Sequence, residues 1–377
     1  MSTPRPADLR FMRRALRLAR RGYGRTSPNP MVGAVLIKGR HIIGEGWHHG
    51  AGLPHAEIEA LHDAARRGHS PRGTTLYVTL EPCCTHGRTP PCTDAIIAAG
   101  IRRVVVAATD TNPVHAGRGF RLLRRAGITV TTGVLADEAT RLNESFNHWI
   151  IHRTPLVTVK AAMTLDGKIA TASGDSKWIT GPLARDEGMK LREGADAILV
   201  GINTVLADDP SMTFRKGGKQ KTSSRKTLRR VVLDSRARTP LRAKVISDEF
   251  AAALTTIVVT RQAPKHRITA LAKHVPVLIA PDRAGRVDLR WLLRHLGRQS
   301  VTSLLVEGGG EVNAAFLNER LAYRVAFFYA PKILGDLDAR RGVAGDGARN
   351  WADALELEDV AWRRIGPDLL LTARLAT

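Results

Sequence analysis

The feature that most constrains the fold is a regular alternation of short apolar runs with amphipathic segments. Residues 75–80 (TLYVTL) and 103–108 (RVVVAA) are apolar runs of strand length, and the segment between them includes a helical pattern. Strands separated by helices predict an α/β sandwich with a largely parallel sheet. The expected elements are a basic amphipathic helix ending near Gly22, strands 31–37, 41–47, 75–80 and 103–108, and helices 57–67, 94–99 and 120–126.

The alternation resets around residues 146–155, where Pro155 introduces a new apolar run. A chain of 377 residues is also long enough for two cores. We therefore expect a first domain over 1–150 and a second over 151–377, with no repeat between them. In the second domain we expect strands 156–161, 197–201, 230–233, 256–260, 275–279, 303–306 and 324–329, and a helix from about Val312 after a glycine-rich turn.

All three cysteines, Cys83, Cys84 and Cys92, fall within ten residues. A disulfide framework spreads its cysteines to join distant segments, so this crowding indicates metal binding instead. The N-terminus lacks the apolar core of a signal peptide, and no apolar run approaches the length of a membrane span. We expect a cytoplasmic protein without a membrane partner.

The metal hypothesis becomes specific when His55-Ala56-Glu57 is considered with Pro82-Cys83 and Cys92. One histidine and two cysteines can bind zinc and leave its fourth position open, which allows the ion to activate water. Glu57, which is not a ligand, can then carry protons to a leaving amine. This pattern is typical of zinc deaminases that act on nucleobases. Pro82 favours Cys83 over Cys84 as the ligand, which leaves Cys84 as a buried bystander.

The formal net charge of +23 raises the possibility of a nucleic-acid partner. Residues 1–150 hold 21 basic and 11 acidic side chains, and the remainder holds 37 and 24, so both halves share the excess. Segment 215–230 has eight basic residues and no acidic ones, and its composition indicates a mobile surface loop. A generally basic, solvated surface explains the charge better than a nucleic-acid-binding arm.

Several motifs of the first half resemble the deaminase domain of the bifunctional deaminase/reductase family of riboflavin biosynthesis. They are Ser27–Pro30 (SPNP), Pro54–Glu57 (PHAE) and Thr79–Cys92 (TLEPCCTHGRTPPC). Nucleic-acid deaminases usually bring the two cysteines closer, whereas this chain inserts residues 86–91 (HGRTPP) between them. The resemblance implies that Asn29, His48 and Arg88 contact the pyrimidine or its ribose phosphate. Spacing alone favours other roles, a turn-capping residue for Asn29 and a surface histidine for His48.

The resemblance extends to the family's reductase domain, which has a dihydrofolate-reductase-like fold. It rests on residues 160–168 (KAAMTLDGK), 173–180 (SGDSKWIT), 203–210 (NTVLADDP) and 306–310 (VEGGG). The last of these is a turn without side-chain bulk before a helix, which also suits a phosphate, although a simple tight turn is equally compatible. The resemblance implies an NADPH site formed by Ala162, Trp178, Thr204, Asp208, Ser235, Gly309 and Gly310. It implies a substrate site formed by Ser176, Arg192, Met212, Arg215 and Glu307.

Together these features predict an enzyme that binds one Zn²⁺ and NADPH and acts on a small phosphorylated pyrimidine. The first domain would hydrolyse the exocyclic amine of 2,5-diamino-6-(5-phosphoribosylamino)pyrimidin-4(3H)-one, and the second would reduce its ribosyl side chain to ribityl. We also expect a homo-oligomer. The alternatives are a tRNA or other nucleic-acid deaminase and a nucleic-acid-binding protein with a structural zinc. Both fit less well, because aromatic residues are only 5% of the chain and only three good ligands are apparent.

Overall fold

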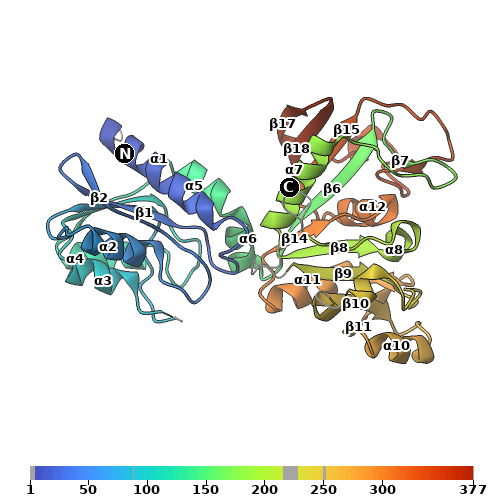
Figure 1. Ribbon diagram of the computed structural model, residues 1–377, viewed down its shortest axis with the longest axis horizontal. Helices are drawn as coiled ribbons and strands as arrows, with labels where there is room; N and C mark the ends of the chain where they lie inside the picture. Colours follow the sequence, from blue (N-terminus) through green and yellow to red (C-terminus); the bar gives the residue numbers. More distant parts are fainter. Residues whose placement is uncertain (1–4, 88, 215–227, 249–251, 377) are drawn as a thin grey trace. The chain divides into compact units, whose positions relative to one another are not determined.

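The computed structural model describes residues 5–87, 89–214, 228–248 and 252–376. The chain forms two compact units, residues 1–153 and 154–377, and each has its own sheet and core (Figure 1). Among the helices of the described residues, none is long and apolar enough to cross a membrane.

The first unit is built around a five-stranded sheet with helices on both faces (Figure 1). Its elements are α1 (Pro6–Ala19), the short 3-10 helix η1 (Arg20–Gly22), β1 (Gly33–Lys38), β2 (His41–Trp47), α2 (Ala56–Arg66), β3 (Thr75–Leu80), α3 (Cys92–Ala98), β4 (Arg103–Ala108), α4 (Arg118–Arg125), β5 (Thr129–Thr131), α5 (Ala136–Leu142) and α6 (Glu144–His152). The strand order is β2-β1-β3-β4-β5.

The side chains of each strand alternate between two apolar layers, as the two-residue period of a strand requires. Leu36 of β1 packs in one core with α2, α3 and α4, while Val35 packs in the opposite core with α1 and α5. The sandwich is therefore as predicted. The expectation of a largely parallel sheet is only half right, because the hairpin makes β1 antiparallel to both β2 and β3.

The second unit contains a nine-stranded sheet in the order β11-β10-β9-β8-β14-β6-β15-β18-β17. Its pairings are parallel from β11 to β15 and antiparallel between β15, β18 and β17. Two further pairs, β7 with β16 and β12 with β13, form two-stranded sheets. The strands of the unit are β6 (Leu156–Thr164), β7 (Lys168–Ala170), β8 (Ala197–Gly201), β9 (Arg229–Leu233), β10 (Thr255–Thr260), β11 (Val277–Ala280), β12 (Asp282–Arg283), β13 (Arg286–Val287), β14 (Ser303–Val306), β15 (Arg324–Ala330), β16 (Arg340–Arg341), β17 (Leu357–Ile365) and β18 (Asp368–Leu375).

The helices of this unit again cover both faces of the sheet. Helices α11 and α12 share one core with alternate residues of the parallel strands, and α8, α9 and α10 share the other. The helices are α7 (Pro182–Gly194), α8 (Ile202–Asp208), α9 (Lys244–Ser247), η2 (Ala252–Leu254), α10 (Lys265–Ala272), α11 (Leu289–Arg298), α12 (Gly310–Asn318) and η3 (Trp351–Asp353).

Two departures from the sequence-based expectations have clear physical reasons. The hairpin of β17 and β18 was not predicted, because β17 is exposed on both faces and therefore lacks an apolar alternation. The expected surface loop 215–230 is wrong at its end, where it overlaps the expected strand 230–233: Arg229 and Arg230 belong to β9, and Arg230 is only 1% exposed. Residues 215–227 lie outside the described residues.

Candidate active sites

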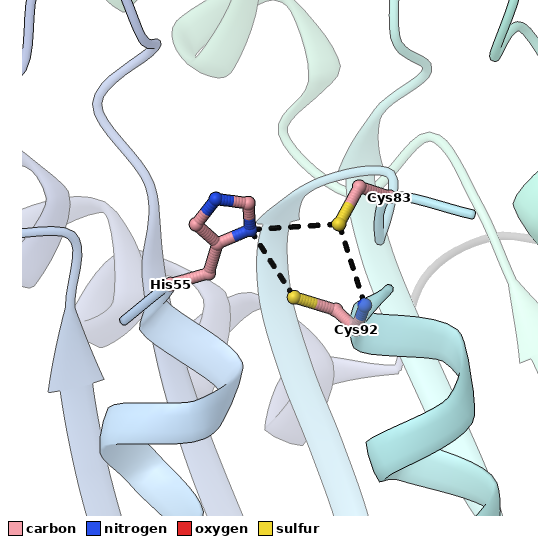
Figure 2. Close-up of side chains that lie close together, drawn as sticks. All are labelled: His55, Cys83 and Cys92. Atoms are coloured by element: carbon pink, nitrogen blue, oxygen red, sulfur yellow. Dashed lines mark hydrogen bonds between the residues drawn. The ribbon is translucent and has the colours of Figure 1, made fainter. Parts of the chain in front are cut away.

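Three side chains of metal-binding type converge in the first unit (Figure 2). His55 immediately precedes α2, Cys83 follows the end of β3, and Cys92 begins α3. The Nδ1 atom of His55 lies 3.3 Å from Cys92 Sγ and 3.5 Å from Cys83 Sγ. All three donor atoms lie within 4.8 Å of one another. Zinc–ligand bonds of about 2.0–2.3 Å need donors this close, so the set fits one zinc ion with an open position.

The charge distribution also suits a cation. The N–H of Cys92, at the start of α3, donates to Cys83 Sγ over 3.3 Å. The hydrogen bond from the Cys92 thiol, helped by those from His55 and this N–H, lowers the pKa of Cys83 despite burial, and the same thiol–thiol hydrogen bond raises the pKa of Cys92. The hydrogen bond to Cys83 in turn raises the pKa of His55. A thiolate is the form of cysteine that binds metal, so Cys83 is prepared for this role.

Glu57 lies one residue beyond Ala56 in the first turn of α2 and is 3% exposed. Burial is the main reason that the pKa of its carboxyl is raised to about 7, and the negative charge of Cys83 adds to the effect. A carboxyl with this pKa can accept and release a proton near neutral pH, which is the requirement for a general acid–base.

His48 and Asn29 lie beside this cluster. The His48 ring is edge-on to that of His55, with centroids 5.2 Å apart, and its Nε2 lies 3.1 Å from Asn29 Nδ2. His48 is 2% exposed and its Nδ1 contacts the carbonyl of Pro54 at 3.1 Å, so the alternative of a surface histidine is wrong. Burial lowers the pKa of His48, which favours the neutral ring. Arg88 lies outside the described residues.

Sequence reasoning missed Glu81, which shapes the segment that carries Cys83. Its buried carboxylate accepts hydrogen bonds from three backbone N–H groups, those of Asp110, Gly117 and Gly119, over 2.9–3.3 Å. The signal was present, since an acid between a buried strand and Pro82-Cys83 requires partners. Cys84 is buried as expected, with its Sγ 3.6 Å from His115 Nδ1.

In the second unit, Arg192 and Glu307 meet in a cavity of about 180 Å³. The Nε and NH2 groups of Arg192 donate to the two carboxylate oxygens of Glu307 at 2.9 and 2.8 Å, and Lys160 Nζ lies 3.7 Å from Glu307. Burial alone would raise the pKa of Glu307, but the charges of Arg192 and Lys160 hold it at about 2. Two cations against one carboxylate leave a net positive charge, which suits a phosphorylated ligand.

Lys160 is a further residue of this site that the sequence does not single out. Its signal is that it is the one charged residue in β6, in the otherwise uncharged run LVTVKAAMT. Of the predicted cofactor residues, Ala162 and Trp178 line the same cavity. Trp178 is 65% exposed, and the guanidinium of Arg185 lies 4.4 Å from its ring centroid.

The other predicted cofactor residues follow the carboxyl ends of neighbouring parallel strands, where open α/β sheets place their ligands. Thr204 and Asp208 lie on α8 after β8, Ser235 follows β9, and Gly309 follows β14. Ser176 of the predicted substrate site donates to Asp208 Oδ1 at 2.8 Å.

Gly310 at the start of α12 has a packing role. A Cβ at this position would lie 2.2 Å from the backbone oxygen of Arg341, so the glycine allows this close approach. The Met212 side chain is 1% exposed and packs in the core, so only its backbone can face a ligand. Arg215 lies outside the described residues.

The fold and these two sites define a class of protein: a cytidine-deaminase-like domain joined to a dihydrofolate-reductase-like domain. Residues 5–108 match the family model for the cytidine and deoxycytidylate deaminase zinc-binding region, and residues 155–371 match that for the RibD C-terminal domain. The chain belongs to the RibD family of bifunctional deaminase/reductases of riboflavin biosynthesis. It therefore has a zinc-binding deaminase domain and an NADPH-dependent reductase domain.

Individual relatives agree over almost the whole chain. The riboflavin biosynthesis protein RibD of Actinobacillus pleuropneumoniae is 42% identical, covering 97% of this chain and 94% of its own. The solved structure of RibD from Acinetobacter baumannii has a TM-score of 0.87 at 36% identity, covering 98% of this chain and 99% of its own.

A second solved structure, from Thermotoga maritima, is described as a diaminohydroxyphosphoribosylaminopyrimidine deaminase/5-amino-6-(5-phosphoribosylamino)uracil reductase. Its TM-score is 0.83 at 38% identity, covering 98% of this chain and 99% of its own. The predicted family, fold and pair of activities are thus confirmed, in preference to a nucleic-acid deaminase or a zinc-containing nucleic-acid-binding protein.

Proposed function

We propose that this chain removes the exocyclic amine of 2,5-diamino-6-(5-phosphoribosylamino)pyrimidin-4(3H)-one in its first unit and reduces the ribosyl side chain of the product in its second. The observation that carries this proposal is the partly buried cluster of His55, Cys83 and Cys92 beside the buried Glu57, in a chain that also has the cavity of Arg192 and Glu307.

In the deaminase unit, His55, Cys83 and Cys92 would hold zinc, and Glu57 would carry the protons. When bound, the zinc ion supplies a Lewis acid that makes water a nucleophile at neutral pH. Glu57 accepts a proton from the attacking water and then passes protons to the ring nitrogen and the departing amine, which leaves as ammonia. Its burial and its pKa of about 7 support both halves of this transfer.

Asn29 and His48 would orient the substrate beside these groups. The ring of His48 lies next to that of His55, and Asn29 contacts His48; the neutral His48 ring can donate from one nitrogen or accept at the other. Because its Nδ1 contacts the Pro54 carbonyl, Nδ1 carries the proton in the neutral ring and Nε2 faces Asn29 as an acceptor.

In the reductase unit, NADPH supplies the hydride, and the chain supplies positioning and charge. Arg192 and Lys160 would attract the phosphorylated substrate, while Glu307 fixes the planar fork of Arg192 through two hydrogen bonds. Ala162 and Trp178 would contact the cofactor. Ser176, which is hydrogen-bonded to Asp208, would contact the substrate.

The two steps are tested by supplying the substrate to zinc-loaded protein and following ammonia and NADPH absorbance separately. Glu57→Gln removes the proton carrier and should lower ammonia release by about 10²- to 10⁴-fold. It should leave NADPH oxidation with the pre-deaminated intermediate at the wild-type rate. Glu59→Gln, in the same helix, is the matched control and should retain both activities. Survival of ammonia release in Glu57→Gln would exclude the role given to Glu57.

We further propose that the protein is cytoplasmic, because its three cysteines are free and thiols stay reduced in that compartment. We also propose that it is a homo-oligomer, because β17 is the edge strand of the nine-stranded sheet and can pair with another chain. Val360 and Trp362 of this strand are 49% and 60% exposed. Light scattering should show a species larger than the 41.1 kDa chain, and Trp362→Glu should shift it toward the monomer. A monomer at every concentration would contradict the oligomer, and recovery of the protein outside the cytoplasm would contradict the compartment.

A further inference from the structure

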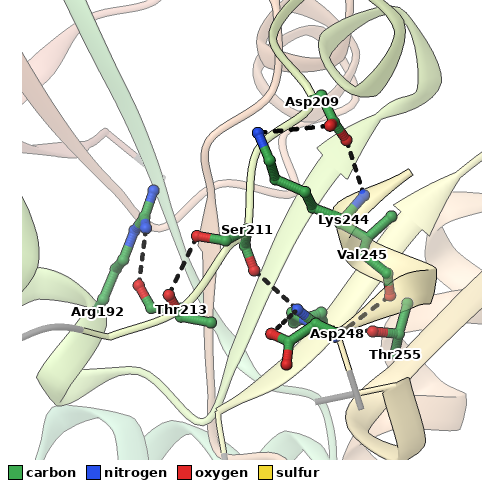
Figure 3. Close-up of polar contacts among 9 residues, drawn as sticks. Arg192, Asp209, Ser211, Thr213, Lys244, Val245, Asp248 and Thr255 are labelled. Atoms are coloured by element: carbon green, nitrogen blue, oxygen red, sulfur yellow. Dashed lines mark hydrogen bonds and ion pairs between the residues drawn. The ribbon is translucent and has the colours of Figure 1, made fainter. Parts of the chain in front are cut away.

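Arg230 is an almost completely buried arginine in β9, with 1% of its surface exposed. A buried charge is costly unless it is paired and fully hydrogen-bonded, and an apolar residue there would be cheaper for stability alone. Its NH1 group donates to the backbone oxygen of Ser211 at 2.8 Å, and its Nε to Thr255 Oγ1 at 2.8 Å. Its NH2 group donates to the backbone oxygen of Val245 at 3.2 Å, and its NH1 group forms an ion pair with Asp248 Oδ2 at 3.5 Å (Figure 3). The contact to Ser211 reaches out of the core to segment 209–214.

Segment 209–214 has an unusual backbone. Asp209 and Met212 have φ angles of 41° and 49°, in the left-handed region that residues other than glycine rarely adopt. Such conformations persist where surrounding contacts impose them, and they gather at ligand sites. The segment is fixed at its start as well: Lys244 donates its backbone N–H to Asp209 Oδ1 at 2.8 Å (Figure 3).

The same segment reaches the reductase cavity. The backbone oxygen of Thr213, two residues after Ser211, accepts a hydrogen bond from Arg192 NH1 at 3.0 Å (Figure 3). The Nε and NH2 groups of that guanidinium hold Glu307. Met212 is therefore held in its left-handed conformation between two carbonyls, each fixed by an arginine, one in the core and one in the cavity.

We infer that Arg230 is a positioning residue of the reductase site: it fixes Ser211 so that Thr213 can hold Arg192 in register with Glu307 and the substrate. This inference rests on the proposed reductase function. Arg230 does not touch the cavity itself, so its effect passes through the backbone of segment 209–214. The purely structural alternative is that it ties β9 to α9 and β10 through Val245 and Thr255.

Two substitutions separate these roles in the full-length protein. Arg230→Met removes the contact to Ser211 together with the others, whereas Thr255→Val removes, among the contacts of Arg230, that of Nε and leaves the contact to Ser211. The readout is steady-state NADPH oxidation with 5-amino-6-(5-phosphoribosylamino)uracil, varied separately from NADPH. Ammonia release by the first unit of the same molecules is an internal control.

Arg230→Met should raise the KM for the pyrimidine about tenfold, which corresponds to the loss of one hydrogen bond to a charged group, with little change in kcat. The KM for NADPH and the rate of ammonia release should stay at wild-type values. Thr255→Val should lower thermal stability and leave the pyrimidine KM unchanged. Arg230→Lys, which keeps the charge, should fall between wild type and Arg230→Met, and it decides the question if Arg230→Met does not fold.

The inference is overturned if the pyrimidine KM of the folded Arg230 variants equals that of wild type, or if Thr255→Val raises it equally. If the wild-type protein releases ammonia in the deaminase assay but oxidises no NADPH with 5-amino-6-(5-phosphoribosylamino)uracil, the proposed reductase function is wrong instead. Failure of the inference about Arg230 and failure of the reductase function are therefore distinguishable.

Discussion

Replacing Glu307 with glutamine should destabilise the reductase unit by an amount that can be worked out from its pKa. The carboxyl falls from an ordinary pKa of 4.5 to about 2, because Arg192 and Lys160 outweigh burial. At 1.36 kcal/mol per pKa unit, the ionised form is stabilised by about 3 kcal/mol. Because the folded pKa is depressed, this stabilisation is complete above about pH 4.5 and is lost as the pH falls toward 2. Glu307→Gln should therefore lose this stabilisation at neutral pH.

Amide hydrogen exchange followed by mass spectrometry measures this locally. At pH 7, peptides covering β14 should exchange on the order of 100-fold faster in Glu307→Gln than in wild type, while β3 peptides of the first unit serve as an internal reference. Glu311→Gln is the matched control, because Glu311 is exposed on the helix that follows Glu307. It should leave both regions unchanged.

The pH dependence supplies the refutation. The difference in β14 protection between wild type and Glu307→Gln should stay constant from pH 8 to pH 5 and shrink below pH 4.5. Equal protection of β14 in the two proteins at pH 7 would show that the ion pair with Arg192 adds no net stability. A difference that persists undiminished at the lowest pH at which the protein stays folded would show that ionisation of Glu307 is not its source.

Two further predictions concern the zinc cluster and the glycine turn. Cys83→Ser should lose bound zinc and ammonia release, whereas Cys84→Ser should keep both; metal analysis of the purified variants checks this, and equal zinc in the two would remove Cys83 from the ligand set. Gly310→Ala places a Cβ 2.2 Å from the oxygen of Arg341, so it should cost about 1–3 kcal/mol in thermal or urea unfolding. An unchanged unfolding midpoint would mean that the segment around Arg341 moves freely.

The sequence was most informative where residue type and local position carry the chemistry. His55, Cys83 and Cys92 are rare donors at the ends of elements that periodicity had already located, so their convergence could be predicted. The sequence was less informative for His48. Spacing alone favours a surface histidine there, but the structure buries His48 beside His55. Burial of one ring depends on the loops that close over it, and no periodic pattern encodes that.

The sequence by itself thus determined the two α/β units, the donor types of the metal cluster and the family to which the chain belongs. Only the tertiary structure decided that Arg192 and Glu307, which the resemblance had already assigned to one site, form an ion pair and that Lys160 joins them. Strand order places β14 between β8 and β6, and this brings Glu307 to Lys160 and Arg192 across long stretches of chain. The tertiary structure also buries Arg230, the last residue of a basic run, where it donates a hydrogen bond to the backbone oxygen of Ser211. Side-chain periodicity fixes which face of a strand is buried, but the pairing of distant strands depends on the packing of the whole sheet.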